Sequence, residues 1–194
     1  MAVKGKKSEA IHLRVSADSK GHLEVLANAT GKNSTQTVEN LLVQAVESVK
    51  ILEMDFAVDD RLWSGGDWTL LKAFQLANVA EDPMLRKLRM YFLAEEGLSP
   101  KDRFVCFAIL WSAGIFSGST AIFQKSENVI TNPDKHRIFS VDLDSIGSKR
   151  SSLEDYAEFR LKNKLVSPSY MEFLRMIEED TSRQTLERFK KRES

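Results

Sequence analysis

Near the N-terminus, apolar and polar residues alternate strictly over residues 10–16. Successive side chains of a β-strand point to opposite faces, so this pattern predicts a strand with one apolar face. The apolar face carries Ile11, Leu13 and Val15. The other face carries Ala10, His12 and Arg14.

The next residues have the spacing of two helices. Ser16 stands where a helix N-cap belongs, Asp18 complements the dipole of the first turn, and Gly31 supplies a left-handed stop. A second helix is predicted to begin near Asn33 or Ser34 and to extend toward residue 56. Its apolar stripe is long and continuous, and consists of Val38, Leu41, Leu42, Ala45, Val46 and Val49.

A single strand leaves the N–H and C=O groups of both its edges unpaired. The simplest partner is the same strand of a second copy of the chain. We therefore expect two strands to pair antiparallel, with four helices closing over Ile11, Leu13 and Val15 of each copy. The sequence predicts an obligate homodimer.

These residues resemble the ribbon-helix-helix family of DNA-binding proteins. The similarity lies in I-H-L-R-V-S-A-D-S from Ile11, L-x-x-L-A-x-x-T-G from Leu23, and K-N-S-T-Q-T-V-E-N-L-L from Lys32. It covers roughly residues 9–49, about a quarter of the chain. The resemblance implies a dimerisation unit of one strand and two helices per chain, which reads DNA with a two-stranded ribbon.

Carried over by position, the resemblance implies three groups of DNA contacts. A two-stranded ribbon fits the major groove of B-DNA, and an arginine there can bind guanine O6 and N7 in a bidentate manner. The base-reading residues would be Ala10, His12 and Arg14, with alanine standing where the family often has a longer polar side chain. The phosphate-binding residues at the start of the second helix would be Lys32, Asn33, Ser34 and Thr35. A basic arm would add further backbone contacts through Lys4, Lys6 and Lys7.

The rest of the chain is predicted to form a mostly helical body with one short strand, which divides the protein into domains 1–56 and 57–194. Helix starts are indicated at Asp67, Asp82-Pro83, Ser99-Pro100, Ser152, Ser167-Pro168 and Thr181. Residues 137–146 alternate like a strand. Residues 104–124 contain no charge, but Gly114 is placed to interrupt them, so a buried core helix is expected there and not a membrane span.

Charge changes this picture only near the N-terminus. The chain has 28 basic and 28 acidic residues. Its first 32 residues, however, carry six basic and three acidic side chains, so a small basic segment precedes a slightly acidic body. A single cysteine, Cys106, excludes an intrachain disulfide and fits a reducing cytoplasm.

Candidate catalytic chemistry is sparse. Asp142 and Asp144 share one face of the predicted strand, where they are expected to face water. The three histidines lack metal-ligand spacing, and Cys106 lies in an apolar segment typical of inert packing. The sequence thus predicts no enzyme, no cofactor and no metal.

The function predicted from the sequence is a sequence-specific transcriptional regulator that binds double-stranded DNA in the cytoplasm, associated with the nucleoid. The resemblance suggests a bacterial, phage or plasmid setting. The body is larger than bare operator occlusion requires, which favours an activator that contacts RNA polymerase or another protein. The alternatives are an accessory factor for conjugation or plasmid partition, and an antitoxin.

Overall fold

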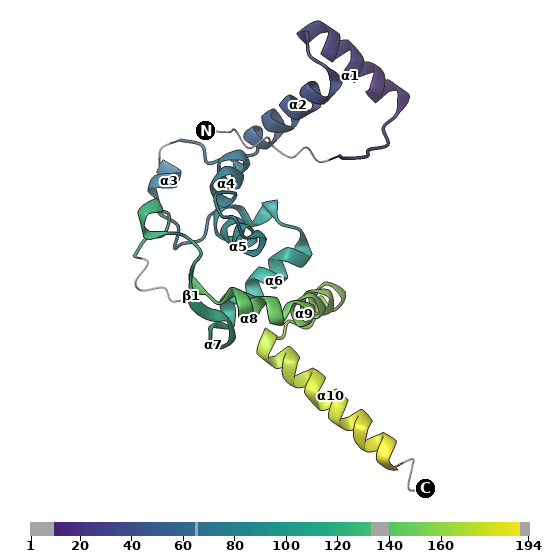
Figure 1. The fold of residues 1–194 in the computed structure, drawn as a ribbon, viewed down its shortest axis with the longest axis vertical. Helices are drawn as coiled ribbons and strands as arrows, with labels where there is room; N and C mark the ends of the chain where they lie inside the picture. Colours follow the sequence, from purple (N-terminus) through teal and green to yellow (C-terminus); the bar gives the residue numbers. More distant parts are fainter. Residues whose placement is uncertain (1–9, 65, 133–139, 191–194) are drawn as a thin grey trace, which may run out of the picture. The chain divides into compact units, whose positions relative to one another are not determined.

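The computed structural model describes residues 10–64, 66–132 and 140–190, with backbone only at 63–64 and 183–190. The protein is mainly helical with one short two-stranded antiparallel sheet (Figure 1). This confirms the predicted class of secondary structure. Contacts within the chain separate an N-terminal unit, Met1–Val46, from a C-terminal unit, Glu47–Ser194. The assignment of DNA binding and dimerisation to residues 1–56 stays a prediction.

Two helices make up the described secondary structure of the N-terminal unit. Helix α1 spans Ala17–Thr30 and helix α2 spans Ser34–Ser48, and α2 runs just past the boundary between the units. Both start close to their predicted positions. Helix α2 does not continue toward residue 56, because the chain beyond it pairs elsewhere: Val49 accepts a hydrogen bond from the Leu70 N–H at 2.9 Å.

The C-terminal unit is built from helices of 4 to 21 residues and one two-stranded sheet. Its elements are, in order, α3 (Arg61–Ser64), α4 (Leu70–Ala77), α5 (Pro83–Ala94), the 3₁₀ turn η1 (Glu95–Gly97), α6 (Pro100–Trp111), α7 (Ala113–Phe116), β1 (Ser117–Ala121), the 3₁₀ turn η2 (Lys125–Glu127), β2 (Ser140–Val141), α8 (Leu143–Ser148), α9 (Arg150–Lys162) and α10 (Tyr170–Lys190). Helix α6 packs against α9 and α5, and α4 packs against α5.

Helix caps explain the starts that were predicted correctly. The Asp82 carboxylate accepts the N–H groups of Met84 and Leu85 at 2.7 and 2.9 Å, directly before Pro83 opens α5. The Ser99 hydroxyl accepts the Asp102 N–H at 3.1 Å at the start of α6. Each cap satisfies N–H groups that have no acceptor within the helix.

Other starts differ by a few residues. Thr69 caps α4 in place of Asp67, and α9 begins at Arg150 instead of Ser152. Helix α10 begins at Tyr170, where Ser169 and Glu172 form the cap that Ser167-Pro168 was expected to provide. The start predicted at Thr181 is wrong, because α10 is continuous there and the Thr181 hydroxyl bonds back to the Ile177 carbonyl at 2.8 Å.

The core of this unit lies around α5, α6 and α9. On α6, Val105, Cys106, Ala108, Ile109 and Leu110 are buried, which confirms a core helix in the uncharged segment. That helix ends at Trp111, and the remaining apolar residues form α7 and β1. No helix in the described part of the chain is long and apolar enough to cross a membrane.

The predicted strand over 137–146 is only partly correct. Residues 137–139 lie outside the described residues. Ser140 and Val141 form β2, which pairs antiparallel with β1. Asp142 then caps α8 by accepting the N–H groups of Asp144 and Ser145, both at 3.0 Å. The predicted pair of carboxylates on one strand face is therefore wrong, because Asp142 is a helix cap and Asp144 lies in the first turn.

A close backbone approach explains Gly118 in β1. A Cβ atom at this position would stand 2.6 Å from both N and Cα of Asp142. Real side chains do not tolerate such contacts with backbone, so one of the two strands would have to move. Gly114, in α7, has open space in the same position.

We therefore expect Gly118→Ala to lower the free energy of unfolding by roughly 1–3 kcal/mol, as overpacking does. Gly114→Ala is the matched control. It is expected to be neutral or slightly stabilising, because alanine favours helix and meets no neighbour. Urea denaturation followed by circular dichroism measures both, and equal midpoints for the two variants would contradict the close approach.

A buried ion pair joins α5 to η2. Arg89 is only 4% exposed. Its guanidinium donates to both carboxylate oxygens of Glu127, at 2.8 and 3.0 Å, and to the Ile122 carbonyl at 2.7 Å. Glu127 also accepts the Gln124 N–H at 2.5 Å, and the Phe123 ring lies 5.1 Å from the guanidinium. These bonds hold the segment after β1 against the core.

Candidate nucleic-acid interface

The residues predicted to form the strand, 10–16, have no regular secondary structure and no strand partner in the described part of the chain. Ile11, Leu13 and Val15 are 76%, 74% and 61% exposed. The predicted strand is thus absent from one isolated chain, which is physically expected, since a strand forms only when its N–H and C=O groups find a partner strand.

Both faces of this segment are accessible. Ala10, His12 and Arg14, the predicted base-reading residues, are exposed like the apolar residues between them. No described side chain of the chain covers either face. In the described structure, no other side chain therefore packs against the three predicted base-reading residues.

The turn between the two helices is sharply defined. Gly31 takes φ +67°, and its N–H donates to Asn28 while the Lys32 N–H donates to the Ala27 carbonyl at 3.0 Å. This closes α1 in the left-handed manner that the sequence predicts, because only glycine adopts that φ at little cost. At the other end, the Ser16 hydroxyl accepts the Ser19 N–H at 3.1 Å.

A reciprocal cap opens α2. The Asn33 side chain accepts the Gln36 N–H at 2.9 Å, and the Gln36 side chain accepts the Asn33 N–H at 3.2 Å. The Asn33 side chain is therefore engaged in the cap. The backbone N–H groups of Ser34 and Thr35 lie in the first turn, where the helix supplies no acceptor and its dipole favours an anion. Lys32 is exposed beside them.

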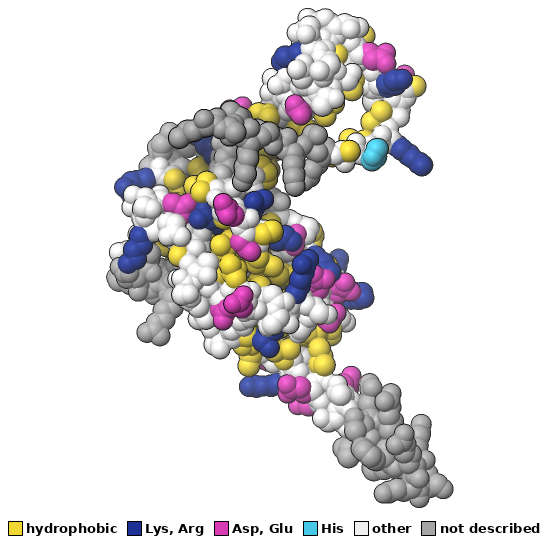
Figure 2. Space-filling view, viewed as in Figure 1, with side chains coloured by type: hydrophobic (Ala, Val, Ile, Leu, Met, Phe, Trp, Pro, Cys, Tyr) yellow, Lys and Arg dark blue, Asp and Glu magenta, His cyan; other side chains and the backbone are white. Residues whose placement is uncertain are grey.

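The N-terminal unit buries little of its apolar surface in a single chain. Among its described residues only Ala27 and Thr37 are buried. Part of the apolar stripe of α2 is open to solvent, with Leu41 and Leu42 about half exposed, and Val43 beside them is exposed to the same extent. Figure 2 shows hydrophobic side chains on the visible surface of this unit. A 37-residue described segment with this little core cannot offset the loss of conformational entropy on folding by itself.

The remaining sequence candidates are placed as follows. Lys4, Lys6 and Lys7 lie outside the described residues. Cys106 is fully buried, and burial raises the pKa of its thiol to about 12, so it stays protonated at neutral pH. Within the described residues, no group of three or more His, Cys, Asp or Glu side chains is arranged to hold a metal ion.

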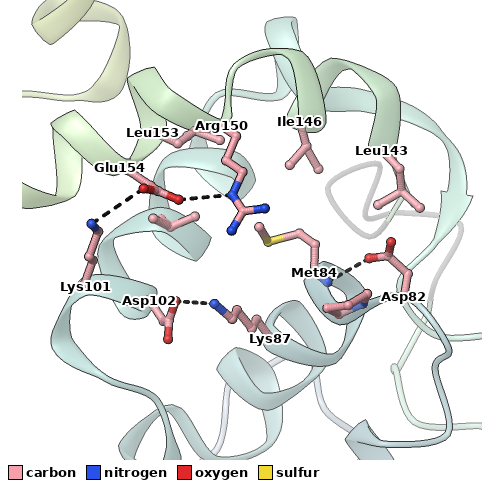
Figure 3. A pocket seen from close by; sticks show the side chains of 13 residues that line it. Asp82, Met84, Lys87, Lys101, Asp102, Leu143, Ile146, Arg150, Leu153 and Glu154 are labelled. Atoms are coloured by element: carbon pink, nitrogen blue, oxygen red, sulfur yellow. Dashed lines mark hydrogen bonds and ion pairs between the residues drawn. The ribbon is translucent and has the colours of Figure 1, made fainter.

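The structure adds one feature that sequence reasoning missed, a cleft in the C-terminal unit with a volume of about 470 Å³. Its walls come from α5, α6, α8 and α9 (Figure 3). Each of these helices contributes only a few residues, spaced across some 70 positions of the chain. No local pattern marks such a site, because its residues meet only when the helices pack.

Comparison with known proteins adds no relative. No family model, no curated protein and no solved structure matches this chain.

Proposed function

We propose that this protein is a dimeric, sequence-specific DNA-binding regulator of transcription. The observation that carries the proposal is the N-terminal unit, in which two helices with capped N-termini follow a segment without regular secondary structure, and most apolar side chains remain exposed. Such a unit needs a partner surface to be stable. A second copy supplies one of matching chemistry.

The first step of the proposal is dimerisation. Two extended segments pair antiparallel, which satisfies their backbone groups and places Ile11, Leu13 and Val15 of both copies on one face. The exposed apolar stripe of α2 then covers that face. An interface that presents the same patch from both subunits is typical of two-fold dimers.

The second step is base reading. Pairing that buries the apolar face turns Ala10, His12 and Arg14 outward, because side chains alternate along a strand. A ribbon of this width enters the major groove. Arg14 has the geometry for a bidentate contact with guanine, His12 donates or accepts a hydrogen bond, and Ala10 offers only apolar contact with a thymine methyl.

The third step is phosphate binding. The first-turn N–H groups of Ser34 and Thr35 are available for a phosphate oxygen, with Lys32 adding a positive charge. Asn33 supports them from the cap and does not itself have to reach the DNA. Phosphate contacts of this kind fix the position of the ribbon but carry no sequence information.

Selection of bound fragments from a random DNA pool tests the proposal. The wild-type protein is expected to enrich a short palindromic or repeated motif. Arg14→Ala is expected to lose that motif, since one good bidentate contact contributes roughly 1–3 kcal/mol of discrimination. Arg175→Ala, which removes an exposed arginine from α10, is the matched control and is expected to keep the motif.

The outcomes separate the alternatives. A motif that survives Arg14→Ala contradicts the reading role of that residue, and no enrichment by the wild type contradicts DNA reading as a whole. Promoter positions of the motif in the source genome support a transcriptional regulator. Positions confined to an origin-like array support the alternative, an accessory factor for conjugation or plasmid partition.

A further inference from the structure

The cleft of the C-terminal unit has the size of a small-molecule site. Its volume of about 470 Å³ lies between four helices, within the roughly 300–1,000 Å³ typical of ligand pockets. Figure 3 shows that its lining side chains converge from α5 and α6 on one side and from α8 and α9 on the other. The DNA-binding proposal makes no use of this cleft.

One part of the cleft is apolar. Val105 of α6, Ile146 of α8 and Leu153 of α9 are all buried and line it, and Leu143 and Met84 extend the apolar surface. A hydrocarbon group bound here would be transferred out of water into contact with aliphatic side chains. Burial of apolar area is the main favourable term in such binding.

Most of the charges around the cleft already pair with one another. Lys87 Nζ lies 2.6 Å from Asp102 Oδ1. The Asp82 carboxylate is held by the backbone N–H groups at the start of α5. Lys101 pairs with Glu158 at 3.1 Å and with Glu154 at 3.8 Å. Each of these groups therefore already has a partner of opposite charge or a backbone N–H group.

Arg150 also has a carboxylate partner, but its side chain is 78% exposed and most of its guanidinium stays open. Among the described residues Glu154 alone bonds to its guanidinium, and only through Nε, at 3.1 Å. Figure 3 shows the guanidinium extending from α9 toward the middle of the ring of lining side chains, with its two Nη groups turned into the cleft. A planar guanidinium with both Nη groups available matches a carboxylate in a bidentate manner.

We propose that this cleft binds a small amphipathic carboxylate, with the carboxylate on Arg150 and the hydrocarbon part on Val105, Ile146 and Leu153. A cationic ligand would find the acidic groups already paired. A phosphate or another fully polar anion would leave the apolar part uncovered. A single open arginine above an aliphatic floor therefore selects a ligand with one anionic end and one apolar end.

Isothermal titration of the full chain with octanoate tests this assignment, with octanol and octylamine as matched probes. Octanoate is expected to bind saturably, with one ligand per chain, and to raise the temperature of unfolding. Octanol lacks the charge and octylamine has the opposite charge, so both are expected to bind at least about tenfold more weakly, as loss of a charged hydrogen bond predicts. Equal binding of octanol, or no saturable binding of octanoate, overturns the proposal.

Two variants test whether the ligand binds in this cleft. Arg150→Gln is expected to weaken octanoate binding about tenfold or more, whereas Arg175→Gln, at an exposed position outside the cleft, is expected to leave it unchanged. Gly147→Leu fills the cleft from α8, where a Cβ atom meets nothing within 4 Å, so the fold is expected to tolerate it. Loss of binding in both cleft variants, with unchanged circular dichroism, supports the site. Binding that survives either variant overturns it.

Discussion

Replacing Glu127 with alanine is expected to lower the free energy of unfolding of the C-terminal unit by about 3–5 kcal/mol. The substitution leaves the Arg89 guanidinium buried without its carboxylate partner. Burying a charge without a counter-ion costs free energy, because the charge loses its hydration and gains no compensating interaction. It also removes the acceptor of the Gln124 N–H that helps to close η2. Urea denaturation followed by circular dichroism measures the change.

An exposed ion pair provides the control for this prediction. Glu158 accepts a hydrogen bond from Lys101 at 3.1 Å, and both side chains are well exposed. Glu158→Ala is expected to leave the urea midpoint nearly unchanged, because water screens such pairs. If Glu127→Ala costs no more than Glu158→Ala, the Arg89–Glu127 pair is not a major tie between α5 and η2.

Replacing Leu13 with aspartate is expected to convert the proposed dimer into a monomer and to abolish specific DNA binding. In the proposed dimer, Leu13 of each copy would lie on the buried face of the ribbon, so the substitution would place two unpaired carboxylates there. A cost of several kcal/mol corresponds to a dimer dissociation constant raised by more than about 100-fold. Sedimentation equilibrium over a concentration series measures this constant directly.

Leu165→Asp is the matched control, since Leu165 is fully exposed between α9 and α10. This variant introduces the same charge and is expected to keep the oligomeric state and the DNA affinity of the wild type. A dimer that tolerates Leu13→Asp would mean that this face of the segment is not buried in the assembly. A wild-type protein that stays monomeric would remove the dimer from the proposed function.

Local signals were sufficient wherever one short segment fixes its own structure. Ser16, Asp82 and Ser99 cap the helices that the sequence assigns to them, and Gly31 adopts the left-handed conformation expected of it. A cap needs only a side-chain oxygen two or three residues from an open N–H. Such geometry is determined by a few neighbouring residues and does not depend on the rest of the fold.

Local signals failed where a distant partner decides the structure. Helix α2 ends at Ser48 because the following residues pair with the segment before α4, and Asp142 leaves the predicted strand to cap α8. The interruption near Gly114 was expected, but the strand β1 that follows α7 was not, because β1 forms only by pairing with β2 about 20 residues later in the chain. The periodicity of apolar residues shows which face of a helix or strand is buried, but not which other element packs against or pairs with it.

The sequence by itself determined the two N-terminal helices with their turn, the apolar alternation before them and the buried character of α6. It also predicts Ala10, His12 and Arg14 as the reading positions of the proposed ribbon. Only the tertiary structure decided that Arg89 pairs with Glu127 and that Arg150 stands over an aliphatic cleft. These contacts join helices and turns that lie far apart in the chain. The residues meet only because the helices pack against one another, and no local sequence pattern determines which helices will pack.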